Sequence, residues 1–304
     1  MQNIRSEIVR CCRENPREFI RREEESYRNG LEYLAEKIVR IPECRLICIA
    51  GPSASGKTTT ARMLERRMNR QGIPTAVLSM DDFYLPREKQ PLLKDGTPDI
   101  ESVGALDLPR LKECVRQLLT TGKCVAPGFD FLLRRQTDCG AAIAIPKDGK
   151  IIVEGIHGLN PAVTQPLFSF GLFRIYVSVR TNLIEDDGTV FLTGRQIRLI
   201  RRAIRDRQFR SADFAETMRL WPGVVRQEEE NLLRFRENAD ETVSTFHGFE
   251  PAVYSGILSG LLPEMRGSSD SWKEFLSVAE KLRQFQPISP EGIPADSLIR
   301  EFIG

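Results

Sequence analysis

The chain has 304 residues, of which 41% are hydrophobic and 28% charged, enough for one large α/β domain with extensions or for two small domains. Its 44 lysines and arginines nearly balance its 42 aspartates and glutamates, so net charge gives no attraction to a polyanion. The apolar stretches are far shorter than the ~20 residues of a membrane span, and the charged N-terminus lacks a signal-peptide core. With seven cysteines and no CxxC pair, we expect reduced thiols, no zinc site and a cytoplasmic location.

Helices are predicted first along the chain, then strands that alternate with helices. Residues 1–44 carry an apolar stripe typical of helices, which Pro16 and Asn29-Gly30 are expected to break. Helices are also predicted at 59–70, at 108–121 and over much of the chain after 190. The predicted strands are RLICIA (45–50), PTAVLSM (74–80), KIIVEGI (150–156), FRIYVSV (173–179) and ETVSTF (241–246). This order favours an α/β fold with a parallel sheet flanked by helices.

The segment GPSASGKTTT at 51–60 follows the first strand and opens the next helix, and it fits GxxxxGK[ST] at every fixed position. Glycines let the backbone turn its N–H groups inward, and the helix N-terminus adds partial positive charge. The lysine reaches the β- and γ-phosphates, and the hydroxyl of the next residue can bind Mg²⁺. The pattern predicts a nucleoside triphosphate site formed by Gly51, Ser53, Ala54, Ser55, Gly56, Lys57, Thr58 and Thr59.

Two further strands are expected to deliver acids to the same edge of the sheet. Asp81 and Asp82 follow the second strand, and Glu154 ends KIIVE. Carboxylates there can accept a proton from an acceptor hydroxyl or help to bind Mg²⁺. A turn or helix-capping role is the structural alternative for either aspartate.

The segment RLIRRAIRDRQFR at 198–210 predicts a helix with a basic face. Arg198, Arg202 and Arg205 recur at helical spacing, and such a face can clamp a triphosphate. A solvated face or a nucleic-acid contact are the alternatives, and we favour the clamp.

The motifs GPSASGKTT, SMDDFY, VEGIHGLNP and RLIRRAIRDRQFR, in this order and spacing, resemble those of the uridine kinase / phosphoribulokinase family. The chain is most similar to a bacterial uridine-kinase-like branch, and SLIREFIG extends the match to its end. The resemblance implies a P-loop kinase fold that uses ATP and Mg²⁺ to phosphorylate a small hydroxyl acceptor, a nucleoside such as uridine first. It implies a kinase domain at 45–262 with an arginine-rich lid at about 190–215, a helical extension at 1–44 and a helical tail at 263–304. Neither a membrane nor a nucleic-acid partner is expected, and a homo-oligomer is an alternative to a monomer.

Site roles carry over from the family where the motifs match. Asp81 corresponds to the general base and Glu154 to the metal-associated acid, so the implied metal site comprises Thr58, Asp81 and Glu154. Arg205 and Arg210 correspond to arginines near the transferred phosphate, which together with Lys57 and Asp81 complete the catalytic set.

The acceptor side departs from the family pattern. Tyr84 corresponds to an acceptor-site aromatic residue, and Glu101 to an acid that holds ribose hydroxyls. Relatives that accept pyrimidine nucleosides have a YDF-type segment followed by a base-contacting histidine. Here PGFDFLLRR places Phe129 and Arg134 at those positions. The alternatives are therefore a kinase of a sugar-like or anionic acceptor, or a nucleotide-sensing protein that binds RNA through 195–210.

Overall fold

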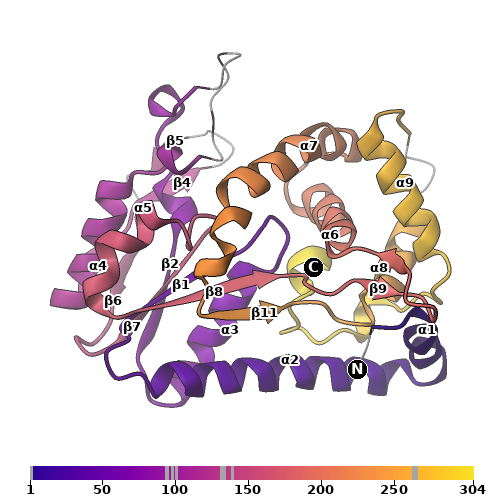
Figure 1. Cartoon of the computed structure of the whole chain (residues 1–304), viewed down its shortest axis with the longest axis horizontal. Coiled ribbons are helices and arrows are strands. Elements are labelled where there is room, and N and C mark those ends of the chain that lie inside the picture. Colours follow the sequence, from indigo (N-terminus) through magenta and orange to yellow (C-terminus); the bar gives the residue numbers. More distant parts are fainter. Residues whose placement is uncertain are drawn as a thin grey trace.

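The central sheet consists of five parallel strands in the order β11-β8-β1-β7-β2 (Figure 1). The computed structural model describes residues 3–92, 96, 99, 102–130, 135–137, 140–261 and 266–304. The strands span Leu46–Ala50 (β1), Thr75–Ser79 (β2), Lys150–Glu154 (β7), Leu172–Ser178 (β8) and Glu241–Ser244 (β11). All five coincide with the predicted apolar runs, and the predicted parallel α/β class is confirmed.

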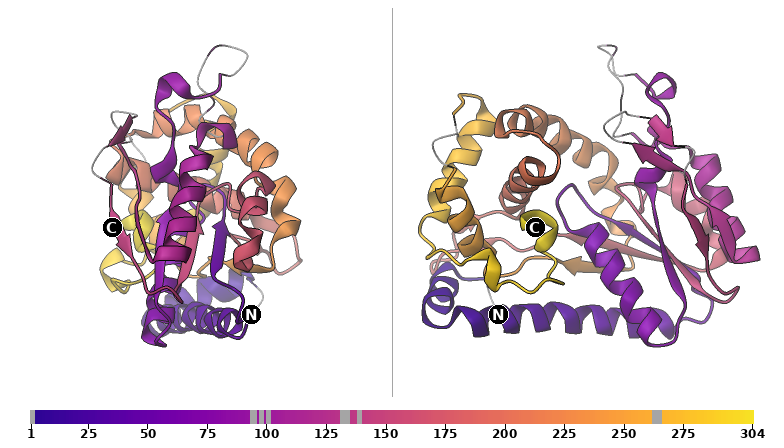
Figure 2. Two further views of the ribbon diagram at one scale, coloured as in Figure 1. Left: turned by 90° about the vertical axis from the view of Figure 1, so that its left-hand side faces the viewer. Right: turned by 180° about the vertical axis from the view of Figure 1, so that it is seen from behind.

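Helices pack on both faces of this sheet (Figures 1 and 2). They span Arg5–Glu14 (α1), Pro16–Val39 (α2), Lys57–Arg70 (α3), Leu108–Thr121 (α4), Pro161–Thr164 (α5), Gly194–Phe209 (α6), Phe214–Asn231 (α7), Glu250–Ser259 (α8), Asp270–Leu282 (α9) and Arg300–Ile303 (α10). None of the described helices is both long and apolar enough to cross a membrane.

Three short antiparallel ribbons lie outside the central sheet. They pair Lys123–Val125 (β3) with Ala142–Ala144 (β6), Gly128–Asp130 (β4) with Arg135–Thr137 (β5), and Leu183–Ile184 (β9) with Val190–Leu192 (β10).

Strand β1 shows why both faces of the sheet must be covered. Successive side chains of a strand point to opposite faces. Ile47 and Ile49 accordingly join one apolar cluster with residues of α2, α3 and α6, whereas Leu46 and Cys48 join a second cluster with residues of α4. A continuous apolar run is therefore buried on both sides, as expected for a central parallel strand.

The predicted break at Asn29-Gly30 is wrong. Pro16 does begin a new helix, with Asn15 as its N-cap, but α2 continues through Gly30 to Val39 without interruption. Burial of Tyr27, Leu31 and Leu34 on one face outweighs the unfavourable helix propensity of a single glycine.

Candidate active site

The phosphate loop, residues 51–56, joins β1 to α3 in one tight curve. Gly56 has a φ of +82°, a conformation that favours glycine, and Ala54 also has a positive φ of 56°. A Cβ atom on Gly51 would lie only 2.2 Å from the carbonyl oxygen of Val177 in β8. The glycines at both fixed positions are thus required by the backbone path, which brings the loop to the N-terminus of α3 and suits it to bind phosphate.

Glu154 lies at the end of β7, next to the phosphate loop, and is only 1% exposed. Thr58 Oγ1 donates to Glu154 Oε2 at 3.2 Å, and Ser79 Oγ donates to Oε1 at 2.7 Å. Burial raises the pKa of Glu154; the positive charge of Lys57 opposes this shift, and the negative charge of Asp81 adds to it.

A hydroxyl and a buried carboxylate side by side are oxygen ligands of the kind that Mg²⁺ prefers. The described residues contain no cluster of three His, Cys, Asp or Glu side chains able to hold a metal. A magnesium ion here would therefore take its remaining ligands from water and substrate phosphates, as magnesium sites in kinases commonly do.

The two neighbouring aspartates follow β2 in a short 3-10 turn, Met80–Phe83. The Asp81 N–H donates to Ser79 Oγ, whose hydroxyl also donates to Glu154, so one serine links both acidic positions. Burial raises the pKa of Asp82, and the charge of Asp81 adds to this shift. The structure thus brings Asp81 to the edge of the sheet that carries Glu154 and the phosphate loop.

Two aromatic residues predicted for the acceptor side meet in space. The ring centroids of Tyr84 and Phe129 are 5.7 Å apart, with the rings tilted by 55°. Phe129 belongs to β4, which packs against the turn that carries Asp81. The two other predicted acceptor residues, Glu101 and Arg134, lie outside the described residues.

Arg198 of α6 is engaged by an acid that the sequence pattern does not reveal. Its guanidinium forms two bonds to Glu228 of α7, at 2.7 and 2.8 Å, and donates to the Ser53 carbonyl at 2.9 Å. The Glu228 carboxylate in turn accepts from the Ser53 N–H at 2.9 Å. This buried pair therefore braces the phosphate loop, which differs from the predicted use of Arg198 in a free basic face.

The two remaining arginines of the predicted basic face, Arg202 and Arg205, lie near Asp206 together with Arg210, which follows α6. Nitrogen–oxygen distances to its carboxylate are 3.2 Å from Arg202, 2.7 Å from Arg205 and 3.6 Å from Arg210. Arg202 also donates to Ser53 Oγ at 2.7 Å. Asp206 is buried and is shared by three cations, one of which, Arg202, contacts the phosphate loop.

Arg201 has no counterpart among the predicted site residues, yet it lies directly beneath the loop. It is fully buried, forms two bonds to Glu250 of α8, at 2.8 and 2.6 Å, and donates to the Ala54 carbonyl at 3.3 Å. Thr245, which follows β11, accepts from Arg201 and donates to the Ser55 carbonyl at 2.7 Å. Arg201 therefore ties the phosphate loop to two elements distant in sequence.

The C-terminal segment is the other part of the site that the motifs do not reveal. Thr59 Oγ1 donates to Glu301 at 2.5 Å, and the Leu298 side chain lies against Gly56. The buried Phe302 ring lies 4.7 Å from the Arg201 guanidinium. The resemblance extends to SLIREFIG but assigns no site role to Glu301, and these contacts are seen only in the three-dimensional packing.

Comparisons with known proteins identify the family of the chain. The family model described as "Phosphoribulokinase / Uridine kinase family" matches residues 46–240, more than half of the chain. A uridine kinase of Mycoplasma genitalium is 26% identical over 196 residues, 64% of this chain and 82% of that protein. One from Geobacillus kaustophilus is 29% identical over 181 residues, 60% of this chain and 76% of that protein. A putative fructose transport system kinase from Silicibacter is 18% identical with a TM-score of 0.45, covering 70% of this chain and 98% of that one. On the family match, the chain belongs to the phosphoribulokinase / uridine kinase family.

Proposed function

We propose that this protein transfers the γ-phosphoryl group of ATP to a hydroxyl of a small acceptor with the help of Mg²⁺. One observation carries the proposal: the phosphate loop and the acids Glu154 and Asp81 share one edge of the sheet, linked by the Thr58–Glu154 and Ser79–Glu154 hydrogen bonds. That is the arrangement that phosphoryl transfer requires, because an acceptor must meet the phosphate beside a proton-accepting group.

In this proposal the loop residues 51–59 cradle the phosphates, and the Lys57 ammonium neutralises their β- and γ-oxygens. Asp81 accepts the proton of the acceptor hydroxyl. Thr58 and Glu154, with Asp81 nearby, hold Mg²⁺, which when bound screens the negative charge of the phosphates. Arg205 and Arg210 stabilise the charge that develops on the transferred group, and Asp206 keeps them in place.

The identity of the acceptor is inferred from two observations that point in different directions. Relatives named uridine kinase favour a nucleoside. Phe129, however, offers no hydroxyl where pyrimidine-binding relatives have a tyrosine, and a site that reads a base edge needs matching polar groups. We therefore expect uridine to be a poor substrate, and a sugar-like diol with an anionic or carbonyl-rich group to be a better one.

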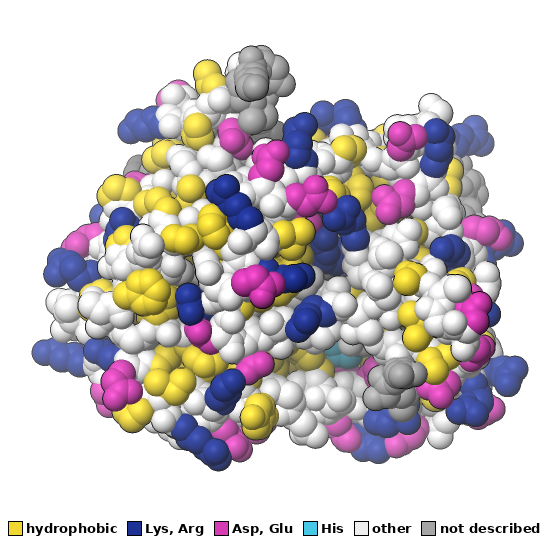
Figure 3. Space-filling model, viewed as in Figure 1, with side chains coloured by type: hydrophobic (Ala, Val, Ile, Leu, Met, Phe, Trp, Pro, Cys, Tyr) yellow, Lys and Arg dark blue, Asp and Glu magenta, His cyan; other side chains and the backbone are white. Residues whose placement is uncertain are grey.

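The alternative of RNA binding through α6 finds little support in the geometry. Arg198, Arg201 and Arg205 are 5%, 0% and 8% exposed and are paired with acids. On the face drawn in Figure 3, positive and negative side chains alternate without a broad basic patch.

The test is ADP release, measured with purified protein, Mg-ATP and a panel of nucleosides, sugars and sugar phosphates. The proposal requires at least one acceptor that stimulates turnover, and Lys57→Ala must abolish that stimulation. Salt-dependent RNA binding without any acceptor-stimulated turnover would instead support the nucleotide-sensing alternative.

A further inference from the structure

The last residues of the chain are built into the phosphate loop region. The side chains of Phe302 and Leu298 are fully buried, and α10 packs against α6. Arg300 donates to the carbonyls of Pro290 and Pro294, at 2.9 and 3.3 Å, which secures the turn before α10. The segment 297–304 is therefore held in place beside the phosphate loop by packing and hydrogen bonds.

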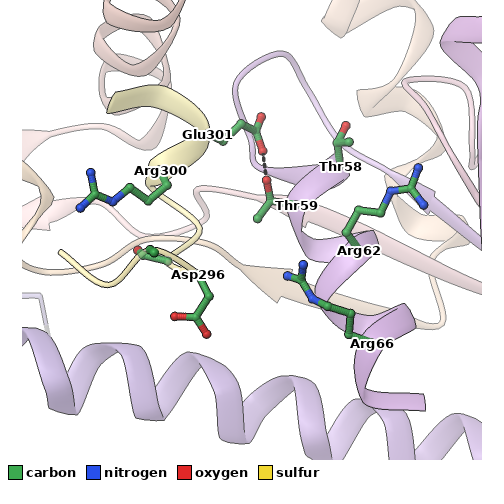
Figure 4. A pocket seen from close by; sticks show the side chains of 9 residues that line it. Thr58, Thr59, Arg62, Arg66, Asp296, Arg300 and Glu301 are labelled. Atoms are coloured by element: carbon green, nitrogen blue, oxygen red, sulfur yellow. Dashed lines mark hydrogen bonds between the residues drawn. The ribbon is translucent and has the colours of Figure 1, made fainter. Parts of the chain in front are cut away.

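One carboxylate of the segment 297–304 contacts the residues that follow the phosphate loop. Glu301 is partly exposed, and its Oε2 accepts from Thr59 Oγ1 at 2.5 Å (Figure 4). A pocket of about 470 Å³ opens at this contact, lined by Thr58 and Thr59 of α3 and by Asp296 and Glu301 of the C-terminal segment, among others. Arg62 and Arg66 project from the next turns of α3 along the same pocket (Figure 4).

The hydroxyls of Thr58 and Thr59 donate to acids of different elements, and this places the two threonines differently toward a nucleotide that binds the loop. Thr58 donates to Glu154, on the side of the acceptor acids, whereas Thr59 donates to Glu301, on the side of the pocket. The γ-phosphate must lie near the acceptor, so the phosphate attached to the nucleoside belongs at the Thr59 end. A phosphate oxygen there needs the same hydroxyl that Glu301 holds, and the two anions repel one another.

We propose that Glu301 sets the affinity for the donor nucleotide: its carboxylate competes with the nucleoside-proximal phosphate for the Thr59 hydroxyl and must turn away when a nucleotide binds. This inference rests on the proposed function. The displacement involves one side chain only, because Phe302 and Leu298 anchor the segment independently. ATP and ADP both carry the nucleoside-proximal phosphate, so Glu301 should weaken the binding of both nucleotides.

The test is titration calorimetry of Mg-ATP and Mg-ADP with the full chain and with Glu301→Gln. The amide oxygen of glutamine can still accept from Thr59, so this variant removes the charge and keeps the shape. We expect Kd for both nucleotides to fall about five- to tenfold, and this gain to shrink as salt is raised. Glu291→Gln is the matched control, since it removes an exposed charge from the short turn Pro290–Gly292 that precedes this segment.

Unchanged or weaker binding of both nucleotides by Glu301→Gln would overturn the inference while leaving the proposed function intact. An equal gain in Glu291→Gln would do the same, because it would reduce the effect to net charge. If the parent chain bound neither nucleotide, the proposed function itself would fail, and the inference with it. Equal melting temperatures of both variants and the parent confirm that the segment stays docked.

Discussion

Arg201 and Glu250 form a fully buried ion pair directly beneath the phosphate loop, with Nε–Oε2 and Nη2–Oε1 distances of 2.8 and 2.6 Å. Further hydrogen bonds satisfy the pair: the Tyr254 hydroxyl and the His247 N–H donate to Glu250, while Arg201 donates to the Thr245 carbonyl. A buried pair of this kind contributes structural specificity when both partners are present and is costly when one is removed.

Glu250→Gln should therefore destabilise the chain strongly. The substitution leaves the Arg201 guanidinium buried without its counter-charge, and loss of one partner of a buried pair costs about 3–5 kcal/mol. Urea unfolding followed by circular dichroism measures this change. Glu229→Gln provides the control, because Glu229 of α7 forms an exposed pair with Arg195 and should change the unfolding free energy by less than about 1 kcal/mol.

The same pair predicts a dependence of stability on acid. Burial alone would raise the pKa of Glu250, but Arg201 and the His247 hydrogen bond outweigh burial and lower the pKa to about 2. Because the folded-state pKa is depressed from the ordinary 4.5, the stabilisation is complete above that value and is lost as pH falls towards 2. Urea unfolding between pH 5 and 2 should show this loss in the parent chain and much less of it in Glu250→Gln.

The fold and one half of the site follow from local sequence signals. A continuous apolar strand followed by GxxxxGKT specifies the loop, and acids directly after strands must emerge at the same edge of a parallel sheet, which is how Asp81 and Glu154 could be placed. The supports of the loop could not be predicted this way. Glu228, Glu250 and Glu301 act from distant elements, and a glutamate in a helix looks the same whether it is solvated or buried against an arginine.

Gly30 shows how tertiary packing overrides a turn signal. It lies inside α2, and a Cβ atom there would meet nothing within 4 Å. Gly30→Ala should therefore stabilise the chain by about 0.5–1 kcal/mol, because alanine loses less backbone entropy in a helix. Thermal unfolding measures the gain. Gly51→Ala, where the Cβ would lie 2.2 Å from a carbonyl oxygen, should instead be destabilising, and a gain there would contradict the described loop geometry.

The two aspartates after β2 should differ in importance. Asp81→Asn should keep ATP binding and lower kcat by about 10²–10⁴-fold, the range of a positioned general base. Asp82→Asn should be much milder. Both substitutions remove one charge from the same turn, so each is the control for the other in steady-state ADP release. Greater sensitivity at Asp82 would assign the base to the neighbouring residue and refute the proposed role of Asp81.

Two arginines of the same region should separate structural support from catalysis. Arg198 is buried and bonded to Glu228 and to the Ser53 carbonyl. Arg198→Met should therefore lower the unfolding free energy by about 3–5 kcal/mol, because it leaves the buried Glu228 carboxylate without its partner.

The Arg210 side chain is 59% exposed and 3.6 Å from Asp206, so Arg210→Ala should cost less than about 1 kcal/mol in stability. If Arg210 acts on the transferred phosphoryl group, however, kcat should fall by about 10²–10³-fold while Kd for ATP changes little. Measuring stability, kcat and Kd on both variants tests the assignment. An Arg210→Ala variant with normal turnover would remove Arg210 from the catalytic set, and a fully stable Arg198→Met variant would show that the buried pair is not what holds Ser53.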